Sequence, residues 1–359
     1  MNSETLPVEP GSRKGSPSHS ICSLETIDRD WLSWIKANPS ANIFHHPAWM
    51  ELLATCYGYR PFLLTVRDQS GQILAGLPVM EVKGFTSRRW VALPFTDHLS
   101  PLSDDRTALD DLYRCLISQY QQERLAKLEV RWELPRLPAA QSSEQHVLHQ
   151  LYLEADTNRV HNRFHSMHQR NIKTAENNGV RIEQGYSEQQ LREFYRLHLM
   201  TRQRQGMPTQ PWRFFQLLGK LLLERDLGFL VLAYKEDECI AASVFLKWQK
   251  TLMYKFGAST HASLKYRPNN LVMWTAIRWG CENDFTIFDL GRTDNENTGL
   301  RNYKSGWGAQ EIPLSYTILS QKPPVEHIGH LMHLMRRAIR HSPVWVSQLA
   351  GQLLYRYFG

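Results

Sequence analysis

The chain has 359 residues, of which 42% are hydrophobic and 21% charged, which is typical of a soluble globular protein with room for two domains. No apolar run approaches the roughly 18 residues that a membrane-spanning helix needs, so we expect no such helix. The formal net charge of +7 favours an anionic partner, which could be nucleic acid, a phosphorylated small molecule or a membrane surface.

Two features of the composition bear on location. Residues 1–20 are rich in Pro, Ser and Gly and lack an apolar core, so we expect a disordered tail rather than a signal peptide. The cysteines, which are Cys22, Cys56, Cys115, Cys239 and Cys281, are odd in number and never form a C-x-x-C pair. This pattern argues for a reducing compartment and against a zinc site. The cytoplasm is therefore the expected location, and no metal is expected.

Apolar alternation and turn residues predict a first half that mixes strands and helices. Pro47 stands where the first turn of a helix tolerates a missing N–H, and the loop after the third strand holds Asp97 and His98. The predicted elements are helices over 28–36, 47–56 and 104–124, strands over 62–67, 73–82, 89–93 and 128–134, a loop over 135–143, a further short helix, and a strand over 151–155.

The second half is predicted to begin with a basic helix over 159–177, which ends at Asn178-Gly179 as a helix C-terminus should. The histidines of this helix have no acidic or Cys neighbours, so phosphate recognition or a solvated face is a better interpretation than zinc. The other predicted elements are helices over 188–205, 211–225 and 268–281, a meander of strands over 229–234, 240–248 and 252–257, and a strand over 285–290.

The two halves share one order of elements: two helices, a three-stranded meander, a helix and a single strand. We therefore expect an α/β (α+β) protein with two domains of like topology, each a mixed, mostly antiparallel sheet flanked by helices. The expected divisions are the tail 1–20, a first domain 21–155, a second domain 156–320 and C-terminal amphipathic helices over 321–359.

The stretch 285–308, FTIFDLGRTDNENTGLRNYKSGWG, is the strongest candidate for a functional site. An apolar strand leads into Gly291 and a polar loop, and charged side chains at such a junction favour a ligand site. A structural ion-pair network around Asp289, Arg292 and Lys304 is the alternative, and 294–298 is expected to be a solvated turn. Candidate residues at the exit of the strand are Asp289, Arg292, Tyr303, Lys304 and Trp307.

Three further sites are candidates in the second half. The helix that begins at Pro268 offers free N–H groups to an anion, and Lys265, Arg267, Asn269 and Asn270 surround its start, which suits a donor with phosphates. A basic approach to an exposed helix start is the alternative. Tyr254, on the strand that ends near Gly257, is either catalytic or part of the core, and Arg202 lies in a segment that suits an anion-binding lip.

Several catalytic motifs are absent from the sequence. It contains no G-x-S-x-G, no Walker loop, no H-E-x-x-H and no dinucleotide fingerprint. Serine hydrolysis, NTP hydrolysis, zinc proteolysis and NAD chemistry therefore have no support in the sequence.

Several segments together resemble the Fem-like branch of the GNAT acyltransferase superfamily, which includes peptidoglycan bridge aminoacyltransferases and exopolysaccharide-associated acetyltransferase-like proteins. They are FHHPAWMELL, LPFTDHLSPL, the basic helix with RNIK, IAASVFLKWQKTLMYKFGAS, RPNNLVMWTAI, FDLGRT and YKSGWGAQEIPLSY. The resemblance covers about Trp31 to Ile318 and implies tandem GNAT-like domains, with acyl transfer in or beside the second.

The resemblance also assigns residues and substrates. The family lysine that stabilises charge at the reacting carbonyl falls on Lys304, and the Asp and Arg of its FD-x-GR motif fall on Asp289 and Arg292. The implied acyl donor is acyl-CoA or aminoacyl-tRNA, with tRNA a candidate partner. Two departures limit this transfer, because LKYRPNN replaces the usual pyrophosphate loop and no long helical arm for tRNA is present.

The expected function follows from both arguments. We expect an enzyme that moves an acyl or aminoacyl group to an amino group of a cell-envelope glycan, peptidoglycan or exopolysaccharide precursor, with a non-catalytic glycan- or RNA-binding scaffold as the alternative. Lys304, Asp289 and Tyr254 are the expected catalytic residues, and Arg292, Arg202, Tyr303 and Trp307 are expected to bind an anionic or lipid-linked acceptor. The amphipathic segment 325–357 either contacts the inner face of the membrane peripherally or packs on the domains.

Overall fold

The computed structural model describes residues 18–23, 29–84, 87–135, 141–320 and 328–343, together with 346, 348, 349, 351 and 355. Its first half contains β1 (Ser18–Ser23), α1 (Arg29–Ala37), the 3-10 helix η1 (Ile43–His45), α2 (Pro47–Tyr57), β2 (Arg60–Arg67), β3 (Ile73–Lys83), β4 (Arg88–Val91), β5 (Leu102–Ser103), α3 (Arg106–Gln122), β6 (Lys127–Val130) and β7 (Gln141–Tyr152).

The second half follows directly along the chain. It contains α4 (Thr157–Asn162), α5 (Ser166–Asn177), β8 (Arg181–Gly185), α6 (Glu188–Gln205), α7 (Trp212–Leu218), the π-helix η2 (Gly219–Leu223), β9 (Gly228–Lys235), β10 (Glu238–Trp248), β11 (Thr251–Ser259), the 3-10 helix η3 (Ala262–Tyr266), α8 (Pro268–Glu282), β12 (Ile287–Asp294), α9 (Thr298–Ser305) and β13 (Gln310–Ser320), and α10 (Ile328–His341) comes after it.

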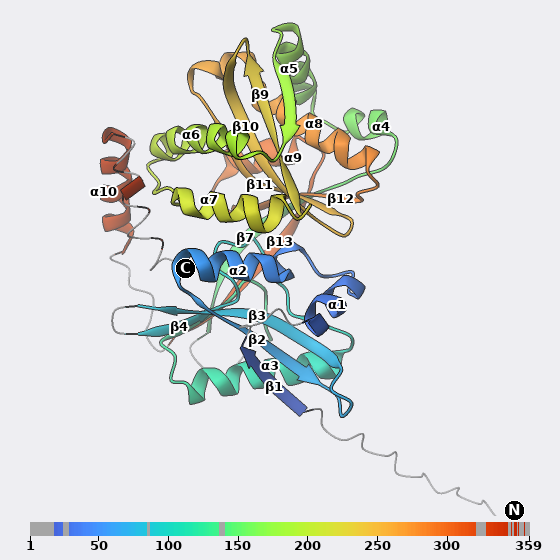
Figure 1. Ribbon diagram of the computed structural model, residues 1–359, viewed down its shortest axis with the longest axis vertical. Helices are drawn as coiled ribbons and strands as arrows, with labels where there is room; N and C mark the ends of the chain where they lie inside the picture. The colour runs from blue at the N-terminus through green and yellow to red at the C-terminus, as the bar shows by residue number, and fades with distance from the viewer. Residues whose placement is uncertain are drawn as a thin grey trace, which may run out of the picture.

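One mixed sheet runs through both halves, in the order β1-β2-β3-β4-β6-β13-β7-β12-β11-β10-β9-β8, with β5 paired to β3. The strands β7 and β13 join the halves, because β13 pairs with β6 as well as with β7, and β7 also pairs with β12. Figure 1 shows these two strands between the lower, first half and the upper, second half. A late strand thus lies within the sheet of the first half, and the domain divisions at 155 and 320 stay predictions.

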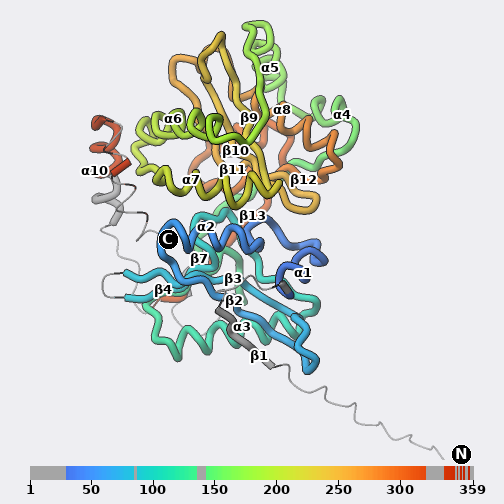
Figure 2. Tube along the Cα trace, viewed as in Figure 1, coloured from blue at the N-terminus to red at the C-terminus, as the bar shows by residue number. Residues whose placement is uncertain are grey.

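The central strands of the second half are buried on both faces. Neighbouring residues of β9 alternate between two cores: Leu230 and Leu232 pack with residues of α6 and α7, whereas Val231 packs with residues of α5 and α8. This alternation follows from the two-residue repeat of a strand. The tube in Figure 2 shows α6 and α7 together on one side of β9–β11. Both faces of β9 are therefore covered by helices.

Several predicted elements are confirmed, and others are corrected. The helix predicted over 188–205 is α6, which begins after a capping box of Ser187 with Gln190 and ends at Gly206, where φ is +69°. The helix predicted over 159–177 is instead two helices, because His165 is an extended N-cap whose imidazole accepts from the backbone N–H of Met167. The strand predicted over 128–134 ends at residue 130.

One prediction for the segment before the second half is wrong. The short helix and the short strand expected before residue 155 are one long strand, β7, over its described length. The solvated turn expected over 294–298 is confirmed, because residues 295 and 296 form a turn and all five residues are exposed. Asp294 ends β12, and Thr298 begins helix α9, which was not predicted. The side chain of Asn297 accepts from the backbone N–H of Leu300 and starts this helix. Both β7 and α9 carry residues of the candidate site, so these corrections matter for function.

The two ends of the chain are described only in part. Residues 18–20, which were assigned to the tail, belong to β1, which pairs with β2, while 1–17 lie outside the described residues. Part of the segment 325–357 also lies outside them, but α10 contacts α6, and the side chain of Gln203 in α6 donates to the carbonyl of Ser342 just after α10. Among the described residues, no helix combines the length and the apolar character that a membrane span requires.

Candidate functional site

The parallel strands β11 and β12 separate in the middle of the second half. They pair only over 251–253 and 287–289. In the pairing of β11 with β10, Lys255 is an additional residue between Tyr254 and Phe256, which makes a β-bulge at this point. The bulge directs its two residues differently, since Tyr254 lines a cavity and Lys255 contacts the first half.

A cavity of about 340 Å³ lies beside this bulge, at the start of α8. It brings together five residues that the sequence predicted for the site, although it predicted them for three different roles. Arg204, the hydroxyl-bearing residues Thr201 and Ser243, and apolar groups such as Met273 complete the wall. The predicted residues in the wall are Tyr254, Arg267, Asn269, Asn270 and Tyr303.

Tyr254 owes its position in this cavity to Gly257. A Cβ atom at position 257 would lie 1.9 Å from the hydroxyl oxygen of Tyr254, so the ring can fold over this position only while it is glycine. Burial raises the pKa of Tyr254 to about 12. The hydroxyl therefore stays protonated at neutral pH and can donate a hydrogen bond into the cavity.

The start of α8 is held by a buried histidine of α5. His168 lies with Nδ1 2.7 Å from the amide nitrogen of Asn270 and with Nε2 3.0 Å from the carbonyl oxygen of Tyr303. The amide of Asn269 donates to the hydroxyl of Ser259 at 3.2 Å. His168 is thus neither a metal ligand nor part of a solvated face, and it connects α8 to α9 behind the cavity.

Lys304 and Asp289 come together behind the cavity, but neither lines it. The Lys304 side chain is only 5% exposed, and its ammonium donates to the carbonyl oxygens of Gly291 and Arg292 at 3.0 and 2.9 Å. Asp289, 1% exposed, accepts from the backbone N–H of Gly291 at 2.7 Å. Burial lowers the pKa of Lys304 to about 8 despite the nearby carboxylates. Both residues therefore fix the backbone of β12 at Gly291, where φ is +73°.

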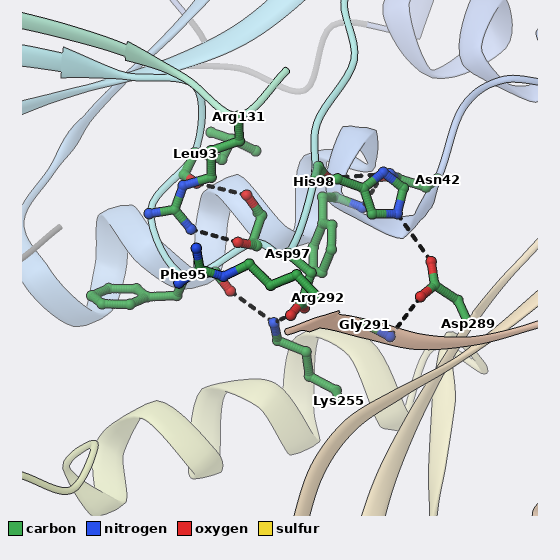
Figure 3. A network of polar contacts seen from close by, with 12 residues as sticks. Asn42, Leu93, Phe95, Asp97, His98, Arg131, Lys255, Asp289, Gly291 and Arg292 are labelled. Carbon is green, nitrogen blue, oxygen red and sulfur yellow. Dashed lines mark hydrogen bonds and ion pairs between the residues drawn. The ribbon is translucent and has the colours of Figure 1, made fainter. Parts of the chain in front are cut away.

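The first half contributes a loop to the site that the sequence did not assign to it. Figure 3 shows Asp97 and His98 of this loop facing the second half. His98 Nε2 lies 3.0 Å from Asp289 Oδ2, and Asp97 Oδ2 lies 2.6 Å from Lys255 Nζ. The only signal in the sequence was an Asp-His pair in a loop after a predicted strand. Its partners are 158 and 191 residues away, so spacing could not reveal them.

This loop has a strained backbone that several contacts hold in place. Leu93 and Phe95 have φ values of +52° and +61°, which non-glycine residues rarely adopt. The carbonyl of Phe95 accepts from Lys255 Nζ at 2.8 Å, and the carbonyl of Asp97 accepts from the hydroxyl of Tyr316. Strain maintained in this way is typical of functional sites.

The charges of the Asp97–Lys255 pair are set by their surroundings. Burial acts to raise the pKa of Asp97, but the positive charges of Lys255, Lys304 and Arg292 together outweigh it and lower this pKa to about 2. Burial lowers the pKa of Lys255, and Asp97 opposes this shift. The Lys255 ammonium also lies 4.8 Å from the ring centre of Phe44. Asp97 is therefore ionised at neutral pH.

Arg292, predicted to bind an anionic acceptor, lies on the first-half side of β12. Its guanidinium is 2.8 Å from His146 Nε2 and is stacked over Tyr316, with 5.2 Å between its central carbon and the ring centre. The side chain is 35% exposed and keeps access to solvent. Its position thus agrees with a binding role, although His146 was not predicted to take part.

Arg292 does not line the cavity, and three other predicted binding residues do not line it either. Trp307 is fully buried and stacks on His168 at 4.2 Å, so the prediction that it contacts a substrate is wrong. Arg202 donates to the carbonyl of Pro208 and to the hydroxyl of Tyr355. Through the second bond it holds Tyr355 of the C-terminal segment. Lys265 is exposed over Tyr266 and is not part of the cavity wall. Helical and aromatic packing places all three elsewhere.

Within the described part of the chain, no group of three or more His, Cys, Asp or Glu side chains is arranged to hold a metal ion. The polar groups at the cavity are hydroxyls, amides and guanidinium groups, which act as hydrogen-bond donors and acceptors. The arrangement can bind an anionic group at the start of α8 and can donate a hydrogen bond to a carbonyl oxygen beside Tyr254.

Comparison with known families identifies one domain. Residues 162–305, which include the whole cavity wall, match the family described as Acetyltransferase (GNAT) domain.

Two curated relatives match shorter segments. UDP-N-acetylmuramoylpentapeptide-lysine N(6)-alanyltransferase from Weissella viridescens is 24% identical over 127 residues, which cover 35% of this chain and 37% of the relative. Lipid II:glycine glycyltransferase from Staphylococcus aureus is 28% identical over 92 residues, which cover 24% of this chain and 22% of the relative. The matched segments thus span well under half of either relative.

A solved structure matches most of the chain. The crystal structure of FemX has a TM-score of 0.64 and 14% sequence identity to this chain, and the match covers 88% of this chain and 99% of FemX. At this identity the likeness concerns the fold.

Proposed function

We propose that this chain, which contains a GNAT acetyltransferase domain and is similar to Fem-type proteins, transfers an acyl or aminoacyl group to an amino group of a cell-envelope glycan or of a peptidoglycan or exopolysaccharide precursor. The tandem GNAT-like fold that the sequence predicted supports this proposal. The observation that carries this proposal is the cavity beside the bulge of β11, where Tyr254 and Tyr303 face the start of α8.

The cavity suits the chemistry of acyl transfer. An amine attacks the carbonyl carbon of an activated ester or thioester, the carbonyl oxygen gains negative charge, and the leaving group departs with its bonding electrons while the amine loses a proton. The Tyr254 hydroxyl is a protonated donor in the wall, and the bulge at Lys255 interrupts the ladder of backbone hydrogen bonds beside it. We propose that the Tyr254 hydroxyl and the backbone at the bulge stabilise the developing oxyanion.

Lys304 and Asp289 support this site from behind. We propose that they position it, because Lys304 holds the carbonyls of Gly291 and Arg292 and Asp289 holds the N–H of Gly291. His98 adds a bond from the first half to Asp289. The roles of Lys304 and Asp289 are therefore indirect in this proposal, whereas Tyr254 contacts the reacting group.

The donor is proposed to bind with its anionic part at the start of α8. Arg204 and Arg267 are exposed at the wall of the cavity, and the first N–H groups of α8 add positive potential. Acyl-CoA and aminoacyl-tRNA both carry phosphates and an activated carbonyl, so both remain candidates for the donor.

The acceptor is proposed to be an amine on an anionic cell-envelope precursor. One relative is named as an N(6)-alanyltransferase of UDP-N-acetylmuramoylpentapeptide-lysine and another as a lipid II:glycine glycyltransferase, and these names motivate the choice of acceptor. Arg292 is the residue of this chain that we assign to the anionic part. We propose that the reaction takes place in the cytoplasm, where a lipid-linked acceptor would be reached at the inner face of the membrane.

The test of this proposal offers acyl-CoA pools and charged tRNA in turn, each with UDP-N-acetylmuramoylpentapeptide and lipid II, and uses mass spectrometry to find which donor loses its acyl group. The predicted result is an acceptor that gains one acyl or aminoacyl group on nitrogen, and much less of it with Lys304→Ala or Asp289→Asn. Binding of an acceptor with no transfer from any donor would instead indicate a non-catalytic scaffold.

A further inference from the structure

We propose that His146 is a pH-dependent positioning residue for Arg292, and that its neutral form holds the guanidinium where an anionic acceptor binds. This inference rests on the proposed function for the identity of the acceptor, but the contact between the two side chains does not. His146 lies on β7 and Arg292 lies on the adjacent strand β12. In the pairing of these strands Arg292 is opposite Leu148, and the register shifts between Asp289 and Arg292. Neither sequence motifs nor the comparisons assign a role to His146.

The partners of His146 define its protonation in this structure. Arg292 Nη1 lies 2.8 Å from Nε2 and 3.4 Å from Nδ1, and Asp294 Oδ1 lies 3.1 Å from Nδ1. A guanidinium can only donate, so the shorter contact is a hydrogen bond only when Nε2 accepts and carries no proton. The proton of the ring is therefore on Nδ1, where it is donated to Asp294. The geometry is that of neutral His146.

Protonation of the ring removes this arrangement. A proton on Nε2 would point at an N–H of Arg292 across 2.8 Å, so two donors and two positive charges would meet. Nε2 has another partner available, because Glu144 Oε2 is 3.7 Å away. We infer that the protonated ring bonds to Glu144 and that Arg292 loses its bond to His146, keeping the stacking on Tyr316 and the ion pair with Asp294 at 4.0 Å.

The groups that face His146 come from three strands. Glu144 precedes it on β7, Arg292 and Asp294 are on β12, and Tyr316 of β13 meets the imidazole edge to face at 4.6 Å. Arg336 of α10 acts on Asp294 through its charge. Burial acts to lower the pKa of His146, but its bonds to Asp294 and Glu144 outweigh this and raise it above the ordinary value. The change of state thus falls above about pH 6.5, near physiological pH.

The direct test follows both side chains by nuclear magnetic resonance. The imidazole shifts of His146 and the guanidinium ¹⁵N shifts of Arg292 are recorded between pH 5.5 and 9 on the full chain. We expect the two to change together with one midpoint. In His146→Gln, whose amide oxygen can accept from Arg292 at every pH, the Arg292 shifts should stay constant over this range. Guanidinium shifts of Arg292 that stay constant while His146 titrates would overturn the inference.

The functional test measures the affinity for UDP-N-acetylmuramoylpentapeptide by calorimetry over the same range. We expect the wild-type affinity to fall about tenfold below the midpoint, because a bond to a charged group is lost. His146→Gln should keep the high-pH affinity throughout, and His146→Leu should have the low affinity throughout. His149→Gln is the matched control: His149 lies on the same strand and pairs with Glu311 at 3.2 Å, and it should keep the wild-type pH dependence.

The outcomes separate this inference from the proposed function. If Arg292 follows His146 but no variant binds the probe, the proposed acceptor is wrong and the coupling stands. If the probe binds and His146→Gln keeps the wild-type pH dependence, the acceptor is supported and the role of His146 is refuted.

Discussion

Asp97 of the first half and Lys255 of the second form a partly buried ion pair, with 2.6 Å between Oδ2 and Nζ. Their side chains are 22% and 6% exposed, and Lys255 also donates to the carbonyl of Phe95. Because Lys255 is the additional residue of the bulge in β11 and Tyr254 precedes it, this pair connects the first half to the wall of the cavity. The geometry of the site therefore depends on both halves.

Replacing Asp97 by Asn should destabilise the protein strongly. The substitution leaves the Lys255 ammonium buried without its carboxylate, and loss of one partner from such a pair costs about 3–5 kcal/mol. Urea unfolding measures the change in the free energy of unfolding. Asp226→Asn is the matched control, because Asp226 pairs with Lys247 at the same 2.6 Å but is 89% exposed. It should cost less than about 1 kcal/mol, and equal costs in the two variants would contradict our account of burial.

The same pair predicts how stability depends on pH. The pKa of Asp97 is about 2 in the folded protein and 3.8 in its unperturbed state, so the folded state favours the ionised form. Its contribution of about 2 kcal/mol is complete above pH 4 and is lost as the pH falls from about 4 toward 2. The difference in unfolding free energy between wild type and Asp97→Asn should therefore shrink over this range. A difference independent of pH would show that folding does not lower the pKa of Asp97.

Tyr254→Phe should lower turnover by about 100-fold, the usual effect of removing one hydrogen bond to a developing oxyanion, and should change unfolding free energy by less than about 1 kcal/mol. Steady-state kinetics with the donor found by mass spectrometry measures the effect. Tyr234→Phe is the control, since burial also raises the pKa of Tyr234 to about 12 but Tyr234 does not line the cavity. Similar turnover in wild type and Tyr254→Phe would remove Tyr254 from the mechanism.

Gly257→Ala should impair turnover through Tyr254. The new Cβ would lie 1.9 Å from the Tyr254 hydroxyl, so the ring must leave its place in the cavity. We expect a loss of at least the size seen in Tyr254→Phe, and little further loss when the two changes are combined. Gly299→Ala is the control, because a Cβ there meets no atom within 4 Å. Additive losses in the double variant would mean that Gly257 acts independently of Tyr254.

Local sequence signals were enough for many elements. Ser187 and Gly206 mark the two ends of α6, and the apolar alternation of the meander marks β9, β10 and β11. Such signals were insufficient for β7, whose partners β12 and β13 come more than 130 residues later in the chain. The short polar helix α9 was not predicted, because its start depends on one side-chain bond from Asn297.

The sequence predicted some residues of the candidate site, but it did not predict how they are arranged. It selected Tyr254, Asn270 and Tyr303, which the fold brings to one cavity. It predicted that Trp307 binds a substrate, but Trp307 is part of the core and stacks on His168. Asp97 and His98 escaped assignment because their partners are fixed only by the tertiary fold.

The most direct test of the central claim is a single-turnover assay with isotopically labelled acyl donor, scored by mass spectrometry of the acceptor amine. Wild-type protein is predicted to move one labelled acyl or aminoacyl group from acyl-CoA or charged tRNA to the acceptor nitrogen, and Tyr254→Phe is predicted to do so about 100-fold more slowly. Absence of labelled product with every donor and acceptor, from protein shown to be folded and to bind the acceptor, would contradict the assignment of this cavity to acyl transfer.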